Sequence, residues 1–187
     1  MEPVTIIEGK VSVLDRADVD TDQIIPKQFL KRVERTGYGE FLFYDWVRAG
    51  EISLDPNPIL VAGANFGSGS SREHAVWAVQ QFGFQAVVAP SIADIFYTNS
   101  TKNGLLPVVL AEQDCRALAE AGEGRIDLEE QTVTIAGRAV PFEIDPEIKR
   151  RLVGGLDDIA LTLADSDPIA AFEASGKADL APSTTAL

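Results

Sequence analysis

Residues 59–82 read ILVAGANFGSGSSREHAVWAVQQF and join two apolar segments through a turn rich in glycine and serine. Ile59–Ala62 is a continuous apolar run, which is typical of a strand buried on both faces. Ala75–Phe82 has the apolar periodicity of a helix. The turn therefore carries two serines and an arginine, residues 70–72, to a helix N-terminus. Unpaired N–H groups and the positive end of the helix dipole favour a carboxylate or phosphate at such a place.

The same alternation continues along the chain. Apolar runs at Ala86–Ala89 and Pro107–Leu110 follow helix-like segments at Glu73–Phe82 and Ile92–Lys102. Apolar strands that alternate with helices are typical of parallel β-α-β units. A further helix is expected over Ala111–Gly122, ending at the glycine.

The segments outside this region follow other patterns. Val4–Ile7 and Val11–Leu14 are β-prone runs around a glycine and predict a hairpin or a bent strand. Between residues 126 and 144 apolar and polar residues alternate, as in half-exposed antiparallel strands. Helical or partly helical structure is expected at Lys27–Arg32, Thr36–Trp46, Pro146–Leu152, Gly155–Leu163 and Pro168–Ala174. The chain thus predicts one α/β domain over residues 1–175, with a mixed, partly parallel sheet and flanking helices, and a polar tail over residues 176–187.

The composition excludes several classes of protein. The formal net charge of −13 argues against a nucleic-acid partner, which would need a basic face. No run approaches the ~18 apolar residues of a membrane span, and the N-terminus lacks the pattern of a signal peptide. One cysteine can neither form an internal disulfide nor hold an iron–sulfur cluster or a zinc ion by itself. We therefore expect a cytoplasmic protein with no membrane partner and no metal site of its own.

The glycine turn differs from the common phosphate-binding motifs. A Walker A loop would need Gly-Lys-Ser/Thr, and a dinucleotide fingerprint would need glycine in place of Arg72. Ser70 and Glu73 fit a capping box, which would explain both residues structurally. An arginine is unfavourable at a helix N-terminus, so Arg72 indicates an anion to bind. His74 is the only histidine and is too close along the chain to act as the base of a serine hydrolase, so we expect it to be structural.

Two further features predict no site. Asp18, Asp20 and Asp22 have the alternate spacing of a calcium loop, but the glycine and the final glutamate of that loop are absent. Cys115 is expected to be a small buried residue of its helix.

Three segments occur together in the order and spacing of a known family. They are DVDTDQIIP at residues 18–26, GSGSSREH at residues 67–74 and KNGLLP at residues 102–107. In combination they resemble the small subunits of 3-isopropylmalate dehydratase, which are relatives of the swivelling C-terminal domain of aconitase. The resemblance covers residues 1–175 and implies a swivelling β/β/α domain.

The resemblance implies a hydro-lyase of leucine biosynthesis. This enzyme removes water from 2-isopropylmalate and adds it back to give 3-isopropylmalate, through an alkene. The resemblance also implies that a [4Fe–4S] cluster lies on a large-subunit partner, in a heterodimer or a higher assembly. This division agrees with the single cysteine of the chain. The chain is then expected to bind a small diacid substrate and to be active only with its partner.

The resemblance assigns roles within the serine turn. Ser70 or Ser71 matches the serine base that takes the proton from the carbon next to a carboxylate, and alignment of the motif favours Ser70. Arg72, the helix N-terminus and nearby cations would stabilise its alkoxide. Arg72 would hold the substrate carboxylate by a bidentate pair, together with Ser71 and Gly69.

Other residues are expected to support the site or to select the substrate. Thr21 and Asp22 match a polar turn that would orient the site, although capping of a turn would explain them equally well, and His74 is assigned a supporting role. Residues that would contact the variable part of the substrate are Leu30, Lys31, Arg32 and Val33. The apolar members suit an isopropyl group, whereas the cations leave room for citramalate, homoaconitate or citraconate. A non-catalytic anion-binding module is the alternative from another class.

Overall fold

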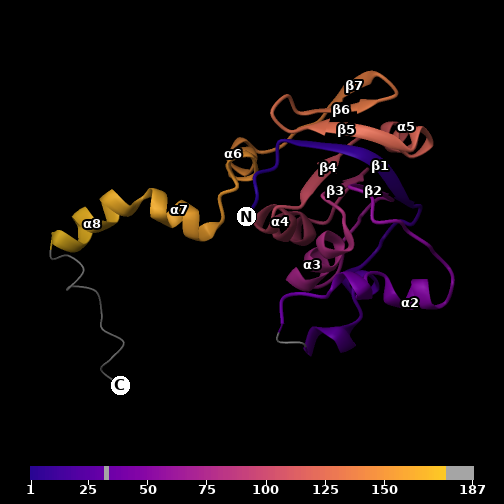
Figure 1. Cartoon of the computed structure of the whole chain (residues 1–187), viewed down its shortest axis with the longest axis horizontal. Helices are drawn as coiled ribbons and strands as arrows, with labels where there is room; N and C mark the ends of the chain where they lie inside the picture. The colour runs from indigo at the N-terminus through magenta and orange to yellow at the C-terminus, as the bar shows by residue number, and fades with distance from the viewer. Residues whose placement is uncertain (32–33, 176–187) are drawn as a thin grey trace.

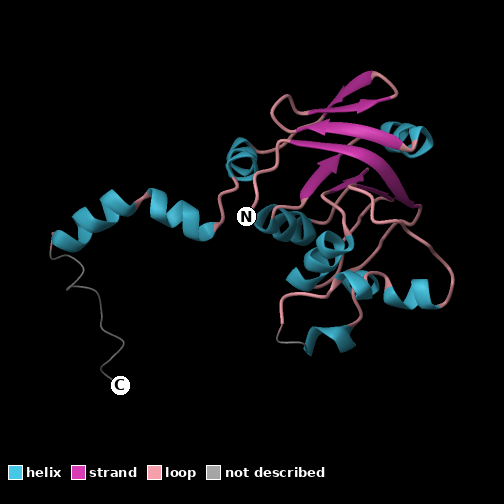
Figure 2. Cartoon of the chain, in the orientation of Figure 1, coloured by secondary structure: helices cyan, strands magenta, loops and turns pink. Residues whose placement is uncertain are grey.

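A computed structural model describes residues 1–31 and 34–175 and contains a seven-stranded sheet with helices on both faces (Figures 1 and 2). The strand order is β4-β3-β2-β1-β5-β6-β7. The strands are β1 (Ile6–Leu14), β2 (Ile59–Ala62), β3 (Ala86–Ala89), β4 (Leu106–Val109), β5 (Glu123–Asp127), β6 (Thr132–Ile135) and β7 (Arg138–Pro141). The helices are α1 (Thr21–Ile24), α2 (Tyr44–Arg48), α3 (Glu73–Phe82), α4 (Asp94–Asn103), α5 (Glu112–Ala121), α6 (Pro146–Gly154), α7 (Asp158–Ala164) and α8 (Ser166–Ala174), with 3₁₀ turns η1 (Lys27–Lys31) and η2 (Gly39–Phe41).

Strand β1 belongs to both halves of the sheet. Its second half, from Val11, pairs parallel with β2, and its first half, Ile6 to Lys10, pairs antiparallel with β5. Of the two forms expected between Val4 and Leu14, the hairpin is wrong and the single bent strand is present, because the chain continues through Gly9 and each half finds a distant partner. The change of partner lies between Lys10 and Val11, close to Gly9, whose φ of 150° favours glycine. The predicted mixed α/β sheet is confirmed.

Both faces of the parallel strands are buried because the side chains alternate between two cores. Leu60 and Ala62 of β2 pack beneath α3 with the aromatic residues of the N-terminal loops. Ile59 and Val61 face the second core, which α5 and the antiparallel strands complete. The pattern of β3 is the same: Val87 faces the first core and its neighbours face the second. The apolar runs seen in the sequence are thus explained.

The topology brings two loops together at the carboxyl end of the sheet. Because β1 and β2 are parallel neighbours, the loops that follow Leu14 and Ala62 emerge side by side. Backbone hydrogen bonds join them, from Gly63 N–H to Arg16 O (3.1 Å) and from Asp18 N–H to Ala64 O (2.8 Å). Residues 15–20 and 63–72 therefore form one surface, and both segments overlap the family motifs.

The C-terminal region extends from this body. The helices α7 and α8 lie away from the sheet (Figure 1), and they agree with two of the predicted helices. The polar tail expected over residues 176–187 lies outside the described residues, so the predicted domain boundary stays a prediction. None of the helices in the described part of the chain is long and apolar enough to cross a membrane.

Candidate active site

The loop after β1 holds the serine turn in place by hydrogen bonds. The Val19 carbonyl accepts the N–H groups of Gly67 (2.7 Å) and Ser68 (3.2 Å). Thr21 donates twice, from its N–H to Ser68 O (2.9 Å) and from its hydroxyl to Ser70 O (2.9 Å). Thr21 is 2% exposed. The structure thus places Thr21 directly against the turn that carries Ser70.

Gly67 lets this turn pass close to α4. Its φ is +78°, and a Cβ built on it would lie 2.3 Å from the Cβ and Cγ of Phe96. Phe96 is 1% exposed, so its ring has no free space into which to move. Gly69 also has a positive φ, +87°, but its nearest neighbours would be 3.5 Å away. The backbone conformation thus favours glycine at both positions, and of the two only Gly67 is also constrained by close packing.

The expected capping box at Ser70 and Glu73 is wrong. Helix α3 begins at Glu73, and its N-cap is Arg72, whose side chain makes no capping hydrogen bond. The carboxylate of Glu73 instead accepts a hydrogen bond from Asn103 Nδ2 at 2.9 Å. The extended backbone at Arg72, with φ −141° and ψ 104°, keeps residues 70–72 outside the helix. As a result the hydroxyl of Ser70 is not consumed by helix capping.

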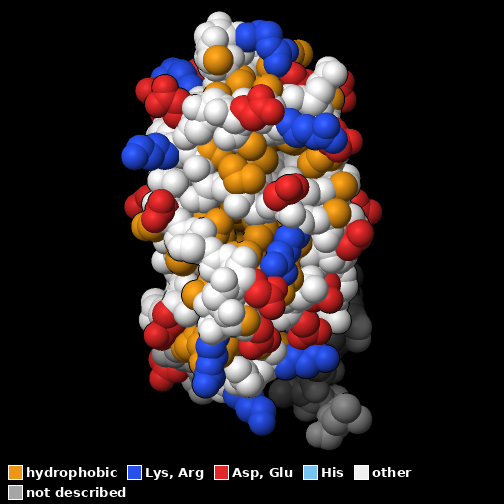
Figure 3. Space-filling model, turned by 90° about the vertical axis from the view of Figure 1, so that its right-hand side faces the viewer, with side chains coloured by type: hydrophobic (Ala, Val, Ile, Leu, Met, Phe, Trp, Pro, Cys, Tyr) orange, Lys and Arg blue, Asp and Glu red, His pale blue; other side chains and the backbone are white. Residues whose placement is uncertain are grey.

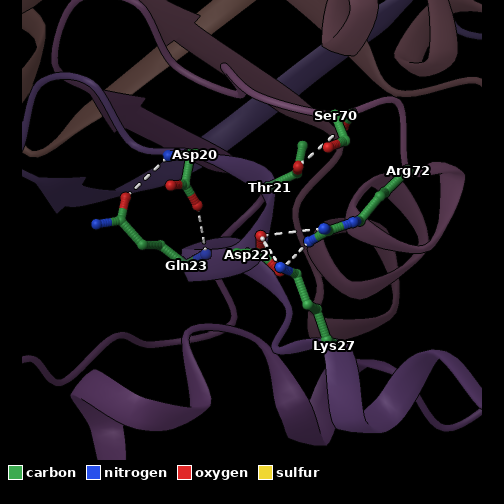
Figure 4. A network of polar contacts seen from close by, with 7 residues as sticks. All are labelled: Asp20, Thr21, Asp22, Gln23, Lys27, Ser70 and Arg72. Carbon is green, nitrogen blue, oxygen red and sulfur yellow. Dashed lines mark hydrogen bonds and ion pairs between the residues drawn. The ribbon is translucent and has the colours of Figure 1, made fainter.

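A capping box is present at the other loop, where α1 begins. Asp20 Oδ1 accepts the N–H of Gln23 at 2.8 Å, and Gln23 Oε1 accepts the N–H of Asp20 at 2.8 Å (Figure 4). This box satisfies two backbone donors at the start of a four-residue helix. It fixes the segment from which Asp22, which lies between these two residues, reaches the serine turn.

Asp22 makes an ion pair with Arg72 across 50 residues of sequence (Figure 4). Arg72 Nη1 contacts Asp22 Oδ1, and Arg72 Nη2 donates to Asp22 Oδ2 at 3.0 Å. Lys27 Nζ lies 3.5 Å from the same carboxylate. The hydrogen bond from Arg72 lowers the pKa of Asp22 below its ordinary value of 3.8. The side chain of Arg72 is only 11% exposed, so its guanidinium is held in a fixed place.

The two serines are exposed at the surface above this ion pair. Ser71 Oγ accepts a hydrogen bond from Asn99 Nδ2 at 3.2 Å. The hydroxyl of Ser70 has no hydrogen-bond partner among the residues that the structure describes. Sequence reasoning missed Asn99 and Lys27. Asn99 lies one helical turn before the KNGLLP motif, and Lys27 directly follows the DVDTDQIIP motif, so proximity to the motifs was the signal that could have found them.

His74 packs between aromatic rings. Its ring centroid lies 5.4 Å from that of Tyr38 and 4.8 Å from that of Trp77. Burial is the main cause that lowers its pKa below 6.5. The role of His74 stays a prediction, and its aromatic contacts are those of a packed side chain.

The residues expected to select the substrate are only partly described. Leu30 is half-buried against the core beside Phe29, and Lys31 is exposed at the end of η1. Arg32 and Val33 lie outside the described residues. Since η1 begins at Lys27, which contacts Asp22, this segment does adjoin the site.

A hollow beside the serine turn is lined by other residues. A pocket of about 450 Å³ lies between α5 and the carboxyl ends of β1 and β2, and it is lined by Val13, Ala17, Val61, Pro90 and Cys115, among others. Figure 3 shows this side of the molecule, with hydrophobic side chains gathered among charged ones. The lining includes Gly63 and Ala64 but none of residues 70–72. The serines thus lie on an open surface.

The chain offers no surface thiol for a metal cluster. Cys115 is 3% exposed, and burial, together with Asp114, raises the pKa of its thiol to about 11. No group of three or more His, Cys, Asp or Glu side chains that could hold a metal occurs within residues 1–31 and 34–175. The aspartates with calcium-loop spacing have separate partners: Asp18 accepts from Asn65 Nδ2 at 2.9 Å, Asp20 caps α1, and Asp22 binds Arg72.

The known proteins to which this chain is similar carry the same enzyme name. The chain is 52% identical to the 3-isopropylmalate dehydratase small subunit of Halalkalibacterium halodurans, over 94% of this chain and 99% of that protein. It is 50% identical to the small subunit of Rubrobacter xylanophilus, over 94% and 95%. A crystal structure of 3-isopropylmalate dehydratase from Methanocaldococcus jannaschii superposes with a TM-score of 0.70 at 28% identity, covering 90% of this chain and 99% of that chain. Residues 53–113 match the Aconitase C-terminal domain family. By this similarity over almost its whole length, the chain belongs to the family of 3-isopropylmalate dehydratase small subunits.

Proposed function

We propose that this chain is the small subunit of a two-subunit hydro-lyase that interconverts 2-isopropylmalate and 3-isopropylmalate in leucine biosynthesis. The observation that carries the proposal is the exposed pair Ser70–Ser71 beside the largely buried side chain of Arg72, in a chain with similarity over almost its whole length to subunits of that name. These names favour isopropylmalate over the related diacids and over a non-catalytic anion-binding module.

The charges of the site suit a substrate with two carboxylates. Arg72 and Lys27 are two cations around one carboxylate, Asp22, in a chain whose formal net charge is −13. A guanidinium has five N–H donors, and Asp22 occupies only the two nitrogens that face it. In our proposal the remaining donors of Arg72 bind a substrate carboxylate, while Asp22 fixes their direction. Asp22 has therefore taken the bidentate pairing that we expected for the substrate.

The chemistry assigned to this chain is proton transfer. The Ser70 oxygen takes the proton from the carbon next to a substrate carboxylate, and the electron pair of that C–H bond forms the alkene as the hydroxyl leaves the adjacent carbon. Rehydration with the opposite orientation completes the isomerisation: the Ser70 O–H gives the proton to the carbon that lost the hydroxyl, and water supplies a hydroxyl to the carbon that lost the proton. A serine alkoxide is a high-energy species, and Arg72 and Lys27 lower its energy by their charge.

The remaining chemistry belongs to a large subunit. The chain's cysteine is buried and the serines are open to solvent, so the site needs a second surface to enclose the substrate. Cysteine thiolates hold iron–sulfur clusters, and we assign the [4Fe–4S] cluster to the partner, where its iron would act as Lewis acid on the substrate hydroxyl.

The test is reconstitution with a cluster-bearing large subunit under anaerobic conditions, followed by the interconversion of the two isopropylmalates. Ser70→Ala should lower kcat by about 10²–10⁴-fold, the usual contribution of a general base, while complex formation on a sizing column stays unchanged. Ser68→Ala is the matched control, because its turn contacts use the backbone alone. Turnover by the small subunit alone, or inactivity with a matched large subunit, would refute the proposal.

A further inference from the structure

Helix α4 presents two asparagines, Asn99 and Asn103, to the start of α3. They are one turn apart and therefore lie on the same face of α4. Asn103 Nδ2 donates to Glu73 Oε1 at 2.9 Å, and Asn103 Oδ1 accepts from Trp77 Nε1 at 3.0 Å. The backbone carbonyl of Asn103 accepts a hydrogen bond from Gln80 Nε2 at 2.9 Å. Asn103 thus fixes this face of α4 against the first two turns of α3.

Asn99 uses this fixed position to reach the serine turn. It is half-buried, and its Nδ2 lies 3.2 Å from Ser71 Oγ. A serine hydroxyl has one donor and two acceptor sites. Since Asn99 fills an acceptor site of Ser71, the O–H of Ser71 is left to donate elsewhere.

A second serine–asparagine pair, Ser12 and Asn57, shows which kind of group a serine O–H binds when its oxygen accepts from an amide. Asn57 Nδ2 donates to Ser12 Oγ at 3.0 Å, and the Ser12 hydroxyl in turn donates to the carbonyl of Asp55 at 2.8 Å. Ser71 has the same amide donor, but among the described residues its hydroxyl has no acceptor. Its O–H is therefore available to an anionic ligand at the open surface.

We propose that Asn99 is a positioning residue that holds Ser71 as a hydrogen-bond donor to the substrate carboxylate. The assignment rests on the proposed function and refines it, because it gives the two serines different roles. Ser71, whose oxygen already accepts from Asn99, binds the substrate. Ser70 lacks such a donor, and its oxygen is free to take the proton.

Steady-state kinetics of the reconstituted two-subunit enzyme test this assignment. Asn99→Ala should raise KM about tenfold, the equivalent of about 1.4 kcal/mol for one lost hydrogen bond, and leave kcat within about twofold. Asn99→Asp should raise KM further, because a carboxylate accepts the Ser71 O–H and repels the substrate. The matched controls Asn57→Ala and Asn57→Asp, at the second pair, should change neither constant.

A double-mutant cycle separates positioning from general structural damage. If Asn99 acts through Ser71, then Asn99→Ala should raise KM in the wild-type background and have no further effect on Ser71→Ala. Full additivity of the two substitutions would overturn the assignment. So would a fall in kcat with KM unchanged, since that result would make Ser71 the base whose alkoxide Asn99 stabilises. An active wild-type complex with an unchanged Asn99→Ala variant refutes this inference alone, whereas an inactive wild-type complex refutes the proposed function and this inference with it.

Discussion

The closest packing in the site is at Gly67, and its substitution gives the sharpest prediction. A Cβ at this position would lie 2.3 Å from two atoms of Phe96, a side chain that is 1% exposed. Gly67→Ala would also place an alanine at a φ of +78°, where the left-handed backbone costs about 1–2 kcal/mol. Overpacking in a filled core adds about 1–3 kcal/mol. We therefore expect a loss of about 2–5 kcal/mol in the free energy of unfolding, the sum of these two contributions.

Two other glycines separate the backbone cost from the packing cost. Gly69 has a φ of +87° with no neighbour closer than 3.5 Å to its Cβ position, and Gly137 has a φ of +82° with nothing within 4 Å. Alanine at either position should cost only the backbone contribution of about 1–2 kcal/mol. The difference between Gly67→Ala and these controls then measures the contact with Phe96.

The assay is urea unfolding of the purified chain, followed by tryptophan fluorescence and circular dichroism. The midpoint for Gly67→Ala should fall below that of both controls, with the same denaturant slope, because the surface exposed on unfolding does not change. A stability for Gly67→Ala equal to that of Gly69→Ala and Gly137→Ala would refute the packing argument. It would mean that the serine turn can move away from α4 at little cost.

Three further outcomes are expected. His74 is the only histidine, so NMR titration of its ring should give a pKa below 6.5. Because folding lowers this pKa, the free energy of unfolding should fall as the pH drops from 6.5 towards the pKa of the folded state. The variant His74→Phe should lose that pH dependence. Asp22→Asn should lower the thermal midpoint near neutral pH, because the ion pair with Arg72 stabilises the fold fully above pH 3.8, the ordinary pKa of an aspartate. This stabilisation is lost as the pH falls through the lowered pKa of Asp22 in the folded state, so the substitution should have no effect in stronger acid. Cys115, whose thiol pKa is about 11, should react with a thiol reagent only as the chain unfolds, and fast labelling of the folded protein would contradict its burial.

The parallel half of the fold could be predicted because its signals are local. Ile59–Ala62, Ala86–Ala89 and Glu73–Phe82 are strands and a helix with the predicted bounds, since an apolar run or a periodic segment is read from neighbouring residues. Strand β1 was predicted less well because its partners are remote in the sequence: Ile6 pairs with Asp127 and Val11 pairs with Ile59. No local pattern contains that information.

The capping box shows the same limit on a smaller scale. Ser70 and Glu73 have the right spacing, but tertiary contacts give each a different use: Thr21 binds the Ser70 carbonyl, and Asn103 binds the Glu73 carboxylate. In the candidate site, the motifs indicated which residues belong together. The pairing of Arg72 with a carboxylate 50 residues away became visible only in three dimensions.

The position of Arg72 explains why the two loops act as one unit. At the N-cap of α3, the guanidinium opposes the positive end of the helix dipole, which is unfavourable for a cation. Asp22 offsets this cost, and the backbone bonds of Val19 and Thr21 to the serine turn hold Asp22 within reach. Lys27 lies beside the same carboxylate, so the group of two cations and one anion keeps a net positive charge. The adjacency of β1 and β2 therefore brings together the charges of the proposed anion site, because neither loop holds both of them alone.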